Sequence, residues 1–597
     1  MPAEPTATGR PQADEECVSR GAAVACLVAV AVVGLGLRLR GLDFLLPHSP
    51  ARDGRIAFTQ VELMRAHDPH PEAHPWNAYY PHLVSKIVAA LPAPAPAPVT
   101  VAVAPGGDPA DPAQYLAAAA APYLQIRLVT VALSLLIVPG IYLLARYFLG
   151  RGGSLLATAL GATSLLHFSF SQQERPHAVV TSFVLLAVLA AVRLRRRPQP
   201  AAYLLAGVAA ALAVGSLHNG AAALPALLVA HLARRRKPGG RDGWWLVAAL
   251  GVVAVAVRWL YPFEFAPAPA AAEAAGAGLE FSGHHIPPGS FDGAGFAALF
   301  GSLASYDPVL SLAAGVGLVT GVRRLVRGLA DDTRRDLLVI LACALPYALV
   351  LGMYRNTAAR FGLPLVPFLA VLGAGGATAV FRAFARGGEL RYRCRLGAAA
   401  AVLLLALPSW ANLRLGAVRS RPDTYTRAAT WIREHVDRER EDVVLLLSWY
   451  QDLPLLEQRR ALEANAAWPW TSPWFDYQRQ LPAGASERGW ALRMPLLADR
   501  QLGQLAVEPW EYLRALDARW VVVERAAPSP RSKPLRVAQR TLEENARRVA
   551  RFSPFADPEQ TSGLGYNRFQ THLARPMVGD VLRAECMGPV LEIYRIE

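Results

Sequence analysis

The sequence predicts a mainly α-helical, polytopic membrane protein that carries a soluble α/β domain at its C-terminal end. Hydrophobic residues make up 53% of the 597 residues and charged residues only 18%, which is too apolar for soluble domains alone. Apolar stretches of membrane-spanning length recur up to about residue 413, and the composition becomes that of a soluble domain from about Arg421 onward. These two observations divide the chain into a membrane part and a soluble part.

A helix needs roughly 20 mainly apolar residues to cross the hydrocarbon core of a bilayer, and about eleven such stretches follow one another along the chain. The division between the fifth and the sixth is the weakest, because only a few polar residues between 216 and 220 interrupt one long apolar run. The expected spans are 21-38, 124-145, 153-167, 177-193, 201-217, 219-233, 243-260, 307-322, 336-353, 361-381 and 396-413.

The distribution of arginine and lysine predicts the orientation of these spans, because short cytoplasmic loops carry an excess of basic residues. With the N-terminus inside, the cytoplasmic loops collect basic clusters, for example at 193-197, 234-237 and 323-335. The opposite short loops then hold only Arg175, Arg258, Arg355 and Arg360. The formal charge of +15 is therefore a topology signal, and we expect no nucleic-acid partner.

The expected layout has a disordered cytoplasmic tail, a transmembrane domain with a long first outer loop, and an extracytoplasmic α/β domain. In the outer domain, 423-436 has the spacing of an amphipathic helix, and three short apolar runs are typical of strands. These strands are expected at 442-450, 519-525 and 590-596. The parts themselves are 1-20 for the tail, 21-415 for the transmembrane domain, 39-123 for its first outer loop and 421-597 for the outer domain.

The first outer loop holds the most chemically varied stretch of the chain, at 48-83, where acids, histidines and aromatic residues lie between two apolar segments. A membrane span could not hold so many ionisable side chains, so this stretch is expected at a membrane face. Interfacial helices are expected at 56-67 and 78-91. Asp53 stands between Arg52 and Arg55, and such cations keep a carboxylate ionised and can bind an anionic ligand. An ordinary solvated ion pair is the alternative interpretation.

The second outer loop, at 168-177, again places an acid beside an arginine. Glu174 and Arg175 stand immediately before Pro176 and a span. In this topology, two acid-bearing loops face one another at the outer ends of the spans. An acid at a helix entrance can also be a simple cap that interacts with the helix dipole, and this alternative stays open.

In their order along the chain, these motifs resemble those of the GT-C glycosyltransferases that use lipid-phosphate sugars. This broad group includes the dolichyl-phosphate-mannose-dependent protein mannosyltransferases and the bacterial lipid A aminoarabinose transferase. The resemblance covers nearly the whole chain. The similar elements are Tyr80-Pro81-His82-Leu83, SQQERPHA at 171-178, RFGLPLVPFLAVL at 360-372 and the closing strand GPVLEIYRI at 588-596.

The resemblance implies a hexosyl- or pentosyltransferase that moves a sugar, with inversion, from a polyprenyl-phosphate donor to an acceptor hydroxyl on the outer face of the bacterial plasma membrane. It implies Asp53 as the catalytic base and gives Glu174 the role of orienting the acceptor or the sugar. Phosphate is a good leaving group, so one carboxylate base suffices. The family often has Asp-Glu in this loop, whereas this chain has Asp53-Gly54. Asp43 and Glu62 therefore stay open as alternative bases.

Cations on the outer face are the candidate ligands of the donor phosphate, because they stabilise the charge of the leaving group. Arg360 is favoured because it lies at a span entrance, where it can meet a headgroup while the lipid tail stays in the bilayer. Snorkelling toward lipid phosphates in general is the alternative. The candidates for donor and phosphate binding are Arg52, Arg55, Lys86, Arg175, Arg258 and Arg360, with Tyr80 and His82, and on charge alone Arg355.

The sequence predicts no cofactor and no metal site. His67, His70 and His74 have the spacing of ligands on one helix face, but the intervening prolines argue against such a helix. The acceptor can be a protein, a glycan or a lipid. Two other functions stay open, namely a transporter and a non-catalytic membrane scaffold of degenerate GT-C type. A transporter should show ionisable residues or broken helices near the middle of the membrane, whereas the spans here are apolar almost throughout.

Overall fold

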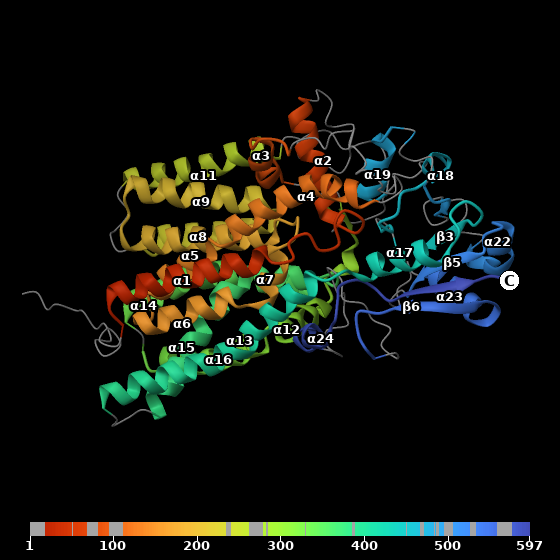
Figure 1. Cartoon of the computed structure of the whole chain (residues 1–597). Coiled ribbons are helices and arrows are strands. Elements are labelled where there is room, and N and C mark those ends of the chain that lie inside the picture. Colours follow the sequence, from red (N-terminus) through yellow and green to blue (C-terminus); the bar gives the residue numbers. More distant parts are fainter. Residues whose placement is uncertain are drawn as a thin grey trace, which may run out of the picture.

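The computed structural model shows a bundle of long helices and a mixed α/β domain beyond one end of that bundle (Figure 1). The expected fold class, a mainly helical membrane protein with a C-terminal α/β domain, is confirmed. The structure describes residues 18–50, 52–67, 81–94, 112–234, 240–261, 279–281, 284–328, 330–384, 389–448, 451–465, 471–482, 484, 489–494, 505–525, 533–557 and 576–597.

Most of the expected spans are long apolar helices. Within the described residues, eight helical segments are long and apolar enough to cross a membrane, or nine if the bent pair α6 and α7 forms one span. The chain is therefore a multi-pass membrane protein. The segments are built from α1 (Arg20–Leu39), α4 and α5 (Ala113–Ser134 and Ile137–Ala145), α6 (Arg151–Ala162), α7 (Leu165–Ser171), α8 (His177–Arg196), α11 (Gly240–Leu260), α13 (Pro308–Val326), α14 (Asp331–Met353), η6 and α15 (Ala359–Leu365 and Val366–Phe384) and α16 (Leu390–Arg419).

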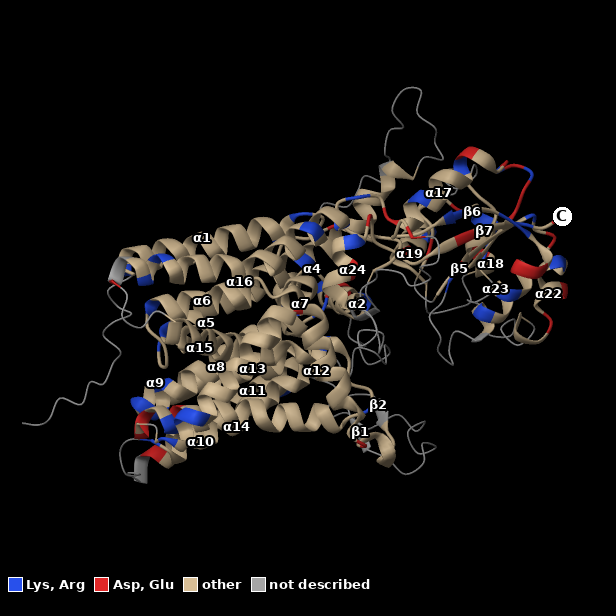
Figure 2. Ribbon diagram, turned by 90° about the horizontal axis from the view of Figure 1, so that it is seen from below, with Lys and Arg blue, Asp and Glu red and all other residues tan. Residues whose placement is uncertain are grey.

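The span expected at 153-167 is broken where α6 ends and α7 begins, and the chain bends there by 53°. Asp307, a buried residue, accepts hydrogen bonds from the Ser164 hydroxyl at 2.6 Å and from the Leu165 amide at 2.6 Å. The first amides of a helix have no partner within the helix, so this carboxylate stabilises the start of α7. The segment after α7, which carries Glu174, then lies at the end of the bundle nearest the soluble domain (Figure 2).

The two expected spans at 201-217 and 219-233 are shorter helices, α9 (Pro200–Ser216) and η3 with α10 (His218–Ala222 and Ala223–Leu232). The chain breaks at Leu217, which has an extended backbone. The Tyr203 hydroxyl near the start of α9 lies 2.8 Å from His231 Nδ1 near the end of α10, so the two helices run antiparallel. The division is thus present, while the total of about eleven spans stays a prediction.

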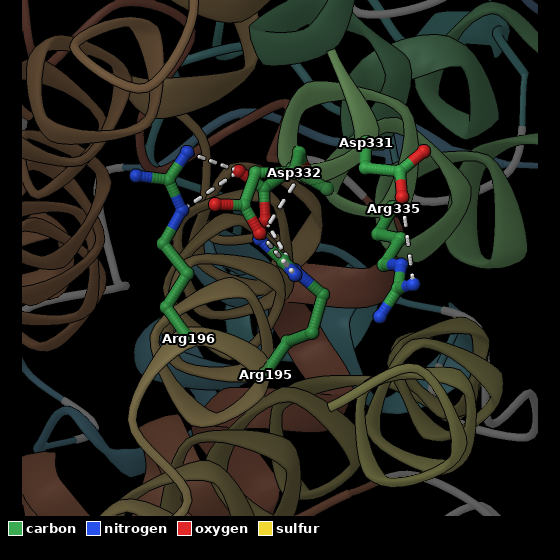
Figure 3. A network of polar contacts seen from close by, with 6 residues as sticks. Arg195, Arg196, Asp331, Asp332 and Arg335 are labelled. Carbon is green, nitrogen blue, oxygen red and sulfur yellow. Dashed lines mark hydrogen bonds and ion pairs between the residues drawn. The ribbon is translucent and has the colours of Figure 1, made fainter. Parts of the chain in front are cut away.

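The bundle end far from the soluble domain holds a charged network between α8 and α14 (Figure 3). Arg195 Nε lies 2.5 Å from Asp336 Oδ1, and both side chains are fully buried. Arg196 Nε donates to Asp336 Oδ2 at 2.8 Å, and Arg195 Nη1 lies 3.2 Å from Asp332 Oδ1. Arginines at the C-terminal end of α8 and acids at the N-terminal end of α14 also interact favourably with the two helix dipoles. The arginine distribution predicts that this end faces the cytoplasm.

Elements expected on the outer face gather at the other end of the bundle, beside the soluble domain (Figures 1 and 2). Helices are present in both stretches where interfacial helices are expected, as α2 (Arg52–Ala66) and α3 (Leu83–Ala89), while their position in the interface stays a prediction. Because α2 begins four residues earlier than expected, Asp53 and Arg55 lie on a helix. The same end carries β1 (Leu279–Phe281), β2 (His284–Ile286), η5 (Pro288–Ser290) and α12 (Ala294–Tyr306). Which side of the membrane this end faces stays a prediction.

The soluble domain is built on a five-stranded sheet with the order β4-β3-β5-β7-β6. β3 runs parallel to β4 and β5, whereas β7 runs antiparallel to both β5 and β6. Its strands are β3 (Val443–Leu446), β4 (Leu492–Arg493), β5 (Trp520–Glu524), β6 (Arg547–Phe552) and β7 (Leu591–Arg595). Its helices are α17 (Thr424–His435), α18 (Arg459–Asn465), α19 (Pro473–Gln480), α22 (Pro509–Ala515) and α23 (Lys533–Asn545).

The expected helix at 423-436 and the three expected strands are all confirmed. β6 was not expected, because its sequence, RRVARF, lacks the alternation of apolar and polar residues, and none of its side chains is fully buried. α24 (Met577–Arg583) lies against the membrane helices instead of the sheet, and its Met577 amide donates to Ser305 Oγ at 2.7 Å.

Candidate functional site

The two acid-bearing segments that are expected on the outer face meet in the structure. A Cβ atom on Gly54, in the first turn of α2, would lie only 2.7 Å from Glu174 Cβ and 3.0 Å from Glu174 Cγ. Real Cβ atoms do not approach this closely, so the α2 backbone touches Glu174 only because residue 54 is a glycine. Asp53 directly precedes Gly54 on α2. Its side chain and that of Arg52 lie outside the described part of the chain.

Glu174 is held by a buried ion pair. Arg127 Nη2 lies 2.7 Å from Glu174 Oε1, and neither side chain is exposed. Arg127 also donates to the carbonyl groups of Leu42 and Phe44 and lies with Cζ 4.4 Å from the centre of the Phe44 ring. Removal of one partner from a buried pair costs about 3–5 kcal/mol, because it leaves an uncompensated charge. Glu174 is therefore held in one place by Arg127.

The segment that leads to Glu174 is held by two further buried arginines. Arg419, at the end of α16, donates to Ser169 Oγ at 3.1 Å and to the Gln172 side-chain oxygen, and its Cζ lies 4.0 Å from the Phe44 ring centre. Arg38, near the end of α1, donates to Ser171 Oγ at 2.9 Å. Contacts from α1, α4 and α16 thus hold 169–174 in a fixed position.

The cations predicted as site residues lie in loops. Arg127, Arg38 and Arg419 were not predicted, and they lie inside or at the ends of apolar helices. An arginine within a membrane span is energetically costly unless it has a partner. Arg127 in the expected span 124-145 could therefore have been recognised from the sequence as a candidate site residue. Tyr123, also on α4, was missed as well. It is buried, its ring stacks on Phe58 at 4.9 Å, and the charges of Arg55, Asp476, Glu174 and Glu62 all act on its phenol group.

Arg55 joins the first loop to the soluble domain. Its Nη2 lies 2.7 Å from Asp476 Oδ2 in α19, and it also donates to the carbonyl and the hydroxyl of Thr471. An open groove of about 610 Å³ lies at this contact, lined by Arg55, Arg459, Leu462, Glu463, Asp476, Arg479 and Gln480. The structure therefore places Arg55 in the wall of a polar groove between α2, α18 and α19.

Lys86 and His82 lie where α3 meets the end of α11. Lys86 Nζ is 4.6 Å from the centre of the Trp259 ring, and burial lowers the pKa of Lys86. The His82 amide donates to the carbonyl of Leu260 at 3.1 Å. Arg258 lies on the same end of α11. The structure thus brings Lys86 and His82 to the helix end that carries Arg258. Tyr80 lies outside the described residues.

Arg175 and Arg360 lie on two segments that pack together. Arg175, a buried residue, lies two residues before the start of α8, and Arg360 lies in η6. The Phe361 ring of η6 lies 5.9 Å from the His177 ring at the start of α8 and 4.9 Å from Arg360 Cζ. η6 therefore packs against the start of α8, and this helix start lies shortly after Glu174 in the sequence. Arg355 instead pairs with Asp292 at 2.6 Å.

The alternative bases have different surroundings. Glu62 is half exposed and lies 3.7 Å from Arg65, one turn along α2. Asp43 lies in the turn between α1 and α2. Within the described residues, no group of three or more histidine, cysteine, aspartate or glutamate side chains is placed to hold a metal. His70 and His74 lie outside those residues, so the expectation of a metal-free site stays a prediction.

Residues 118–261 match the model of the dolichyl-phosphate-mannose-protein mannosyltransferase family. The match supports the resemblance to the GT-C glycosyltransferases, and it includes Tyr123, Arg127, Glu174 and Arg175. No curated protein matches the chain in sequence.

Several solved structures are similar to the chain at low identity. An oligosaccharyltransferase from Archaeoglobus fulgidus is 13% identical, with a TM-score of 0.46, over 90% of this chain and 74% of that one. ArnT from Cupriavidus metallidurans, bound to undecaprenyl phosphate, is 14% identical, with a TM-score of 0.44, over 89% of this chain and 97% of that one. The arabinofuranosyltransferase AftD from Mycobacteria is 14% identical, with a TM-score of 0.42, over 96% and 40% of the two chains.

Proposed function

We propose that this membrane protein is a glycosyltransferase of the GT-C type that moves a sugar from a polyprenyl-phosphate donor to an acceptor hydroxyl on the outer face of the bacterial plasma membrane. One observation carries the proposal: the first turn of α2, which bears Asp53, touches Glu174 of the buried Arg127 pair. The match of residues 118–261 to a family whose description names a dolichyl-phosphate sugar supports this donor class. A lipid-linked donor also suits a site at the outer ends of the spans.

In the proposed reaction, Asp53 accepts the proton of the acceptor hydroxyl while the hydroxyl oxygen attacks the anomeric carbon. The bond from that carbon to the phosphate oxygen breaks, and the polyprenyl phosphate leaves with its electron pair. Attack opposite to the leaving group inverts the anomeric centre. One carboxylate base suffices because phosphate needs little help to depart. Glu174 orients the acceptor or the sugar, and its ion pair with Arg127, at 2.7 Å between Nη2 and Oε1, fixes its position.

The donor phosphate is bound by cations at the span entrances. Arg360 is the main candidate, because η6 packs against the start of α8 and so lies close to the segment with Glu174 and Arg175. Preorganised cations stabilise the charge that develops on the departing phosphate. Lys86 and Arg258 belong to the same proposed set, as does Arg52. Arg55 is not part of this set, because it pairs with Asp476 and hydrogen-bonds to Thr471 in the wall of the groove.

The acceptor is proposed to approach through the groove of about 610 Å³ that Arg55 lines. Arg55 stands two residues after Asp53, so the groove is lined by the same turn of α2 that carries the proposed base. Its lining includes side chains of both charge signs, Arg459, Glu463, Asp476 and Arg479. Such a lining suits a polar acceptor such as a glycan or a peptide better than the acyl chains of a lipid.

The experiment is a transfer assay with purified full-length protein, a radiolabelled polyprenyl-phosphate sugar and cell-envelope acceptors. We expect label on the acceptor together with release of polyprenyl phosphate. Asp53→Asn should lower the rate by about a hundredfold to ten-thousandfold, because it removes the base. Glu174→Gln should lower it less.

Glu439→Gln, an exposed acid of the soluble domain, is the matched control and should be unchanged. Full activity of Asp53→Asn, with loss in Asp43→Asn or Glu62→Gln, would show that another acid is the base. Donor-independent uptake of a solute by proteoliposomes, without sugar transfer, would favour the transporter.

A further inference from the structure

The soluble domain carries a second groove, which shares no residue with the groove at Arg55. It has a volume of about 960 Å³ and lies where the chain enters the soluble domain after α16. Three segments line it: the start of α17 with the residues before it, the end of β6 with the residues after it, and the turn that follows α24. Its lining residues are Arg421, Pro422, Thr426, Arg427, Thr430, Arg551, Phe552, Ser553, Phe555, Ala556, Glu585 and Cys586.

Positive charge dominates this lining, because three arginines face a single acid, Glu585. Arg421 Nη1 donates to the backbone carbonyl of Glu585 at 3.1 Å, and Arg427 Nη1 donates to Cys586 Sγ at 3.7 Å. A thiol is a weak acceptor. Among the described residues, no carboxylate lies within 4.0 Å of either guanidinium group. Both groups therefore keep donors available for an anion.

The third arginine lies in a region where several arginines and acids pair with one another. Arg551 Nε is 3.5 Å from Glu592 Oε1, a fully buried carboxylate. The same carboxyl group also pairs with Arg548 at 3.0 Å and with Arg525 at 3.6 Å. Glu543 also pairs with Arg525, at 2.5 Å, so the arginines of this wall have acidic partners, and the donors available to an anion come from Arg421 and Arg427.

We propose that this groove binds a phosphate group, with Arg421 and Arg427 as its ligands. Guanidinium groups bind phosphate through paired, charge-assisted hydrogen bonds. Phe552 and Phe555 give the groove an apolar side that can contact the uncharged part of a larger ligand.

The position of the groove connects this ligand to the membrane. Arg421 follows the end of α16, at Arg419, by two residues, so the groove begins where this long helix ends. The phosphate is carried either by an anionic phospholipid headgroup or by a free ion. Bound at the exit of the span, it would fix the soluble domain relative to the membrane surface.

The test measures binding of a fluorescent short-chain phosphatidylglycerol to the full-length protein in detergent by fluorescence anisotropy. We expect binding to the wild type, with phosphatidylcholine competing poorly. Arg421→Gln and Arg427→Gln should each weaken binding roughly tenfold or more, because each removes a charged hydrogen bond. Arg427→Lys should retain part of the affinity, since it keeps the charge without the fork.

Arg440→Gln is the matched control, because Arg440 is an exposed arginine of the same domain outside the groove. Competition by inorganic phosphate at comparable concentration would identify the free ion as a sufficient ligand, and its failure to compete would identify the lipid headgroup. Equal affinity of the wild type and both glutamine variants, with circular dichroism showing all of them folded, would overturn the proposal. Equal binding of phosphatidylcholine would overturn it as well.

Discussion

Gly54→Ala should disturb the site even though Gly54 lies in a helix, where alanine is normally more favourable than glycine. An alanine in the interior of a helix is normally about 1 kcal/mol more favourable than a glycine. At residue 54, however, the new Cβ would lie 2.7 Å from Glu174 Cβ, 3.0 Å from Cγ and 3.1 Å from Cδ. Glu174 cannot turn away without breaking its buried pair with Arg127. Such overpacking costs about 1–3 kcal/mol, so we expect a net loss of roughly 0–2 kcal/mol in the free energy of unfolding.

The effect on transfer should be larger than the effect on stability. A shift of about 1 Å between Asp53 and the acceptor can lower the rate about a hundredfold. The assays are thermal unfolding and single-turnover sugar transfer with the purified protein. Gly251→Ala in α11 is the matched control, because nothing lies within 4 Å of a Cβ at that position. If Gly54→Ala were as stable and as active as Gly251→Ala, the contact between α2 and Glu174 could not be what forms the site.

The other predictions concern the donor, the topology and the pH dependence of stability. Arg360→Ala should weaken donor binding and slow phosphate departure together, and Arg360→Lys should recover part of both; equal donor dependence in all three proteins would remove Arg360 from the site. Alkaline phosphatase fused after Arg421 should be active, and activity of a cytoplasm-only reporter there would reject the orientation. Burial raises the pKa of Asp452, which lies next to Ser472 in the soluble domain, to about 7. The folded state then binds this proton more tightly than the unfolded state, so the free energy of unfolding should fall as the pH rises from about 4 to 7. Burial and Asp452 also raise the pKa of Glu457, which acts in the same direction. Denaturation of Asp452→Asn across this pH range should show a smaller slope, and an unchanged slope would contradict the assignment.

The fold could be predicted from the sequence because its main signals are local. Apolar length predicts the long helices, and the excess of arginine at one set of loops agrees with the gathering of the outer elements at one end of the bundle. The break between α6 and α7 is different, because it depends on Asp307, which is far away in the sequence. β6 was missed for a related reason: the sheet supplies its neighbour β7, while its own residues lack a strand pattern.

The site was only partly predictable, because its contacts join distant parts of the chain. Glu174 and the α2 segment were expected on the same face, and the structure brings them into contact. Arg127, the partner of Glu174, was overlooked inside an apolar span. Arg55 was expected to bind phosphate, yet its partner in the structure is Asp476, 421 residues later. No periodicity or local motif could have indicated that pairing.

The choice of donor distinguishes an enzyme that uses a lipid-phosphate sugar from one that uses a nucleotide sugar. The measurement is the amount of radiolabelled sugar that purified wild-type protein transfers to envelope acceptors, with the label supplied either on polyprenyl phosphate or on a nucleotide. We predict transfer from the polyprenyl-phosphate sugar and no more than background transfer from the nucleotide sugar. Efficient use of the nucleotide sugar, or no transfer from any polyprenyl-phosphate sugar, would show that the chain does not use a lipid-phosphate donor.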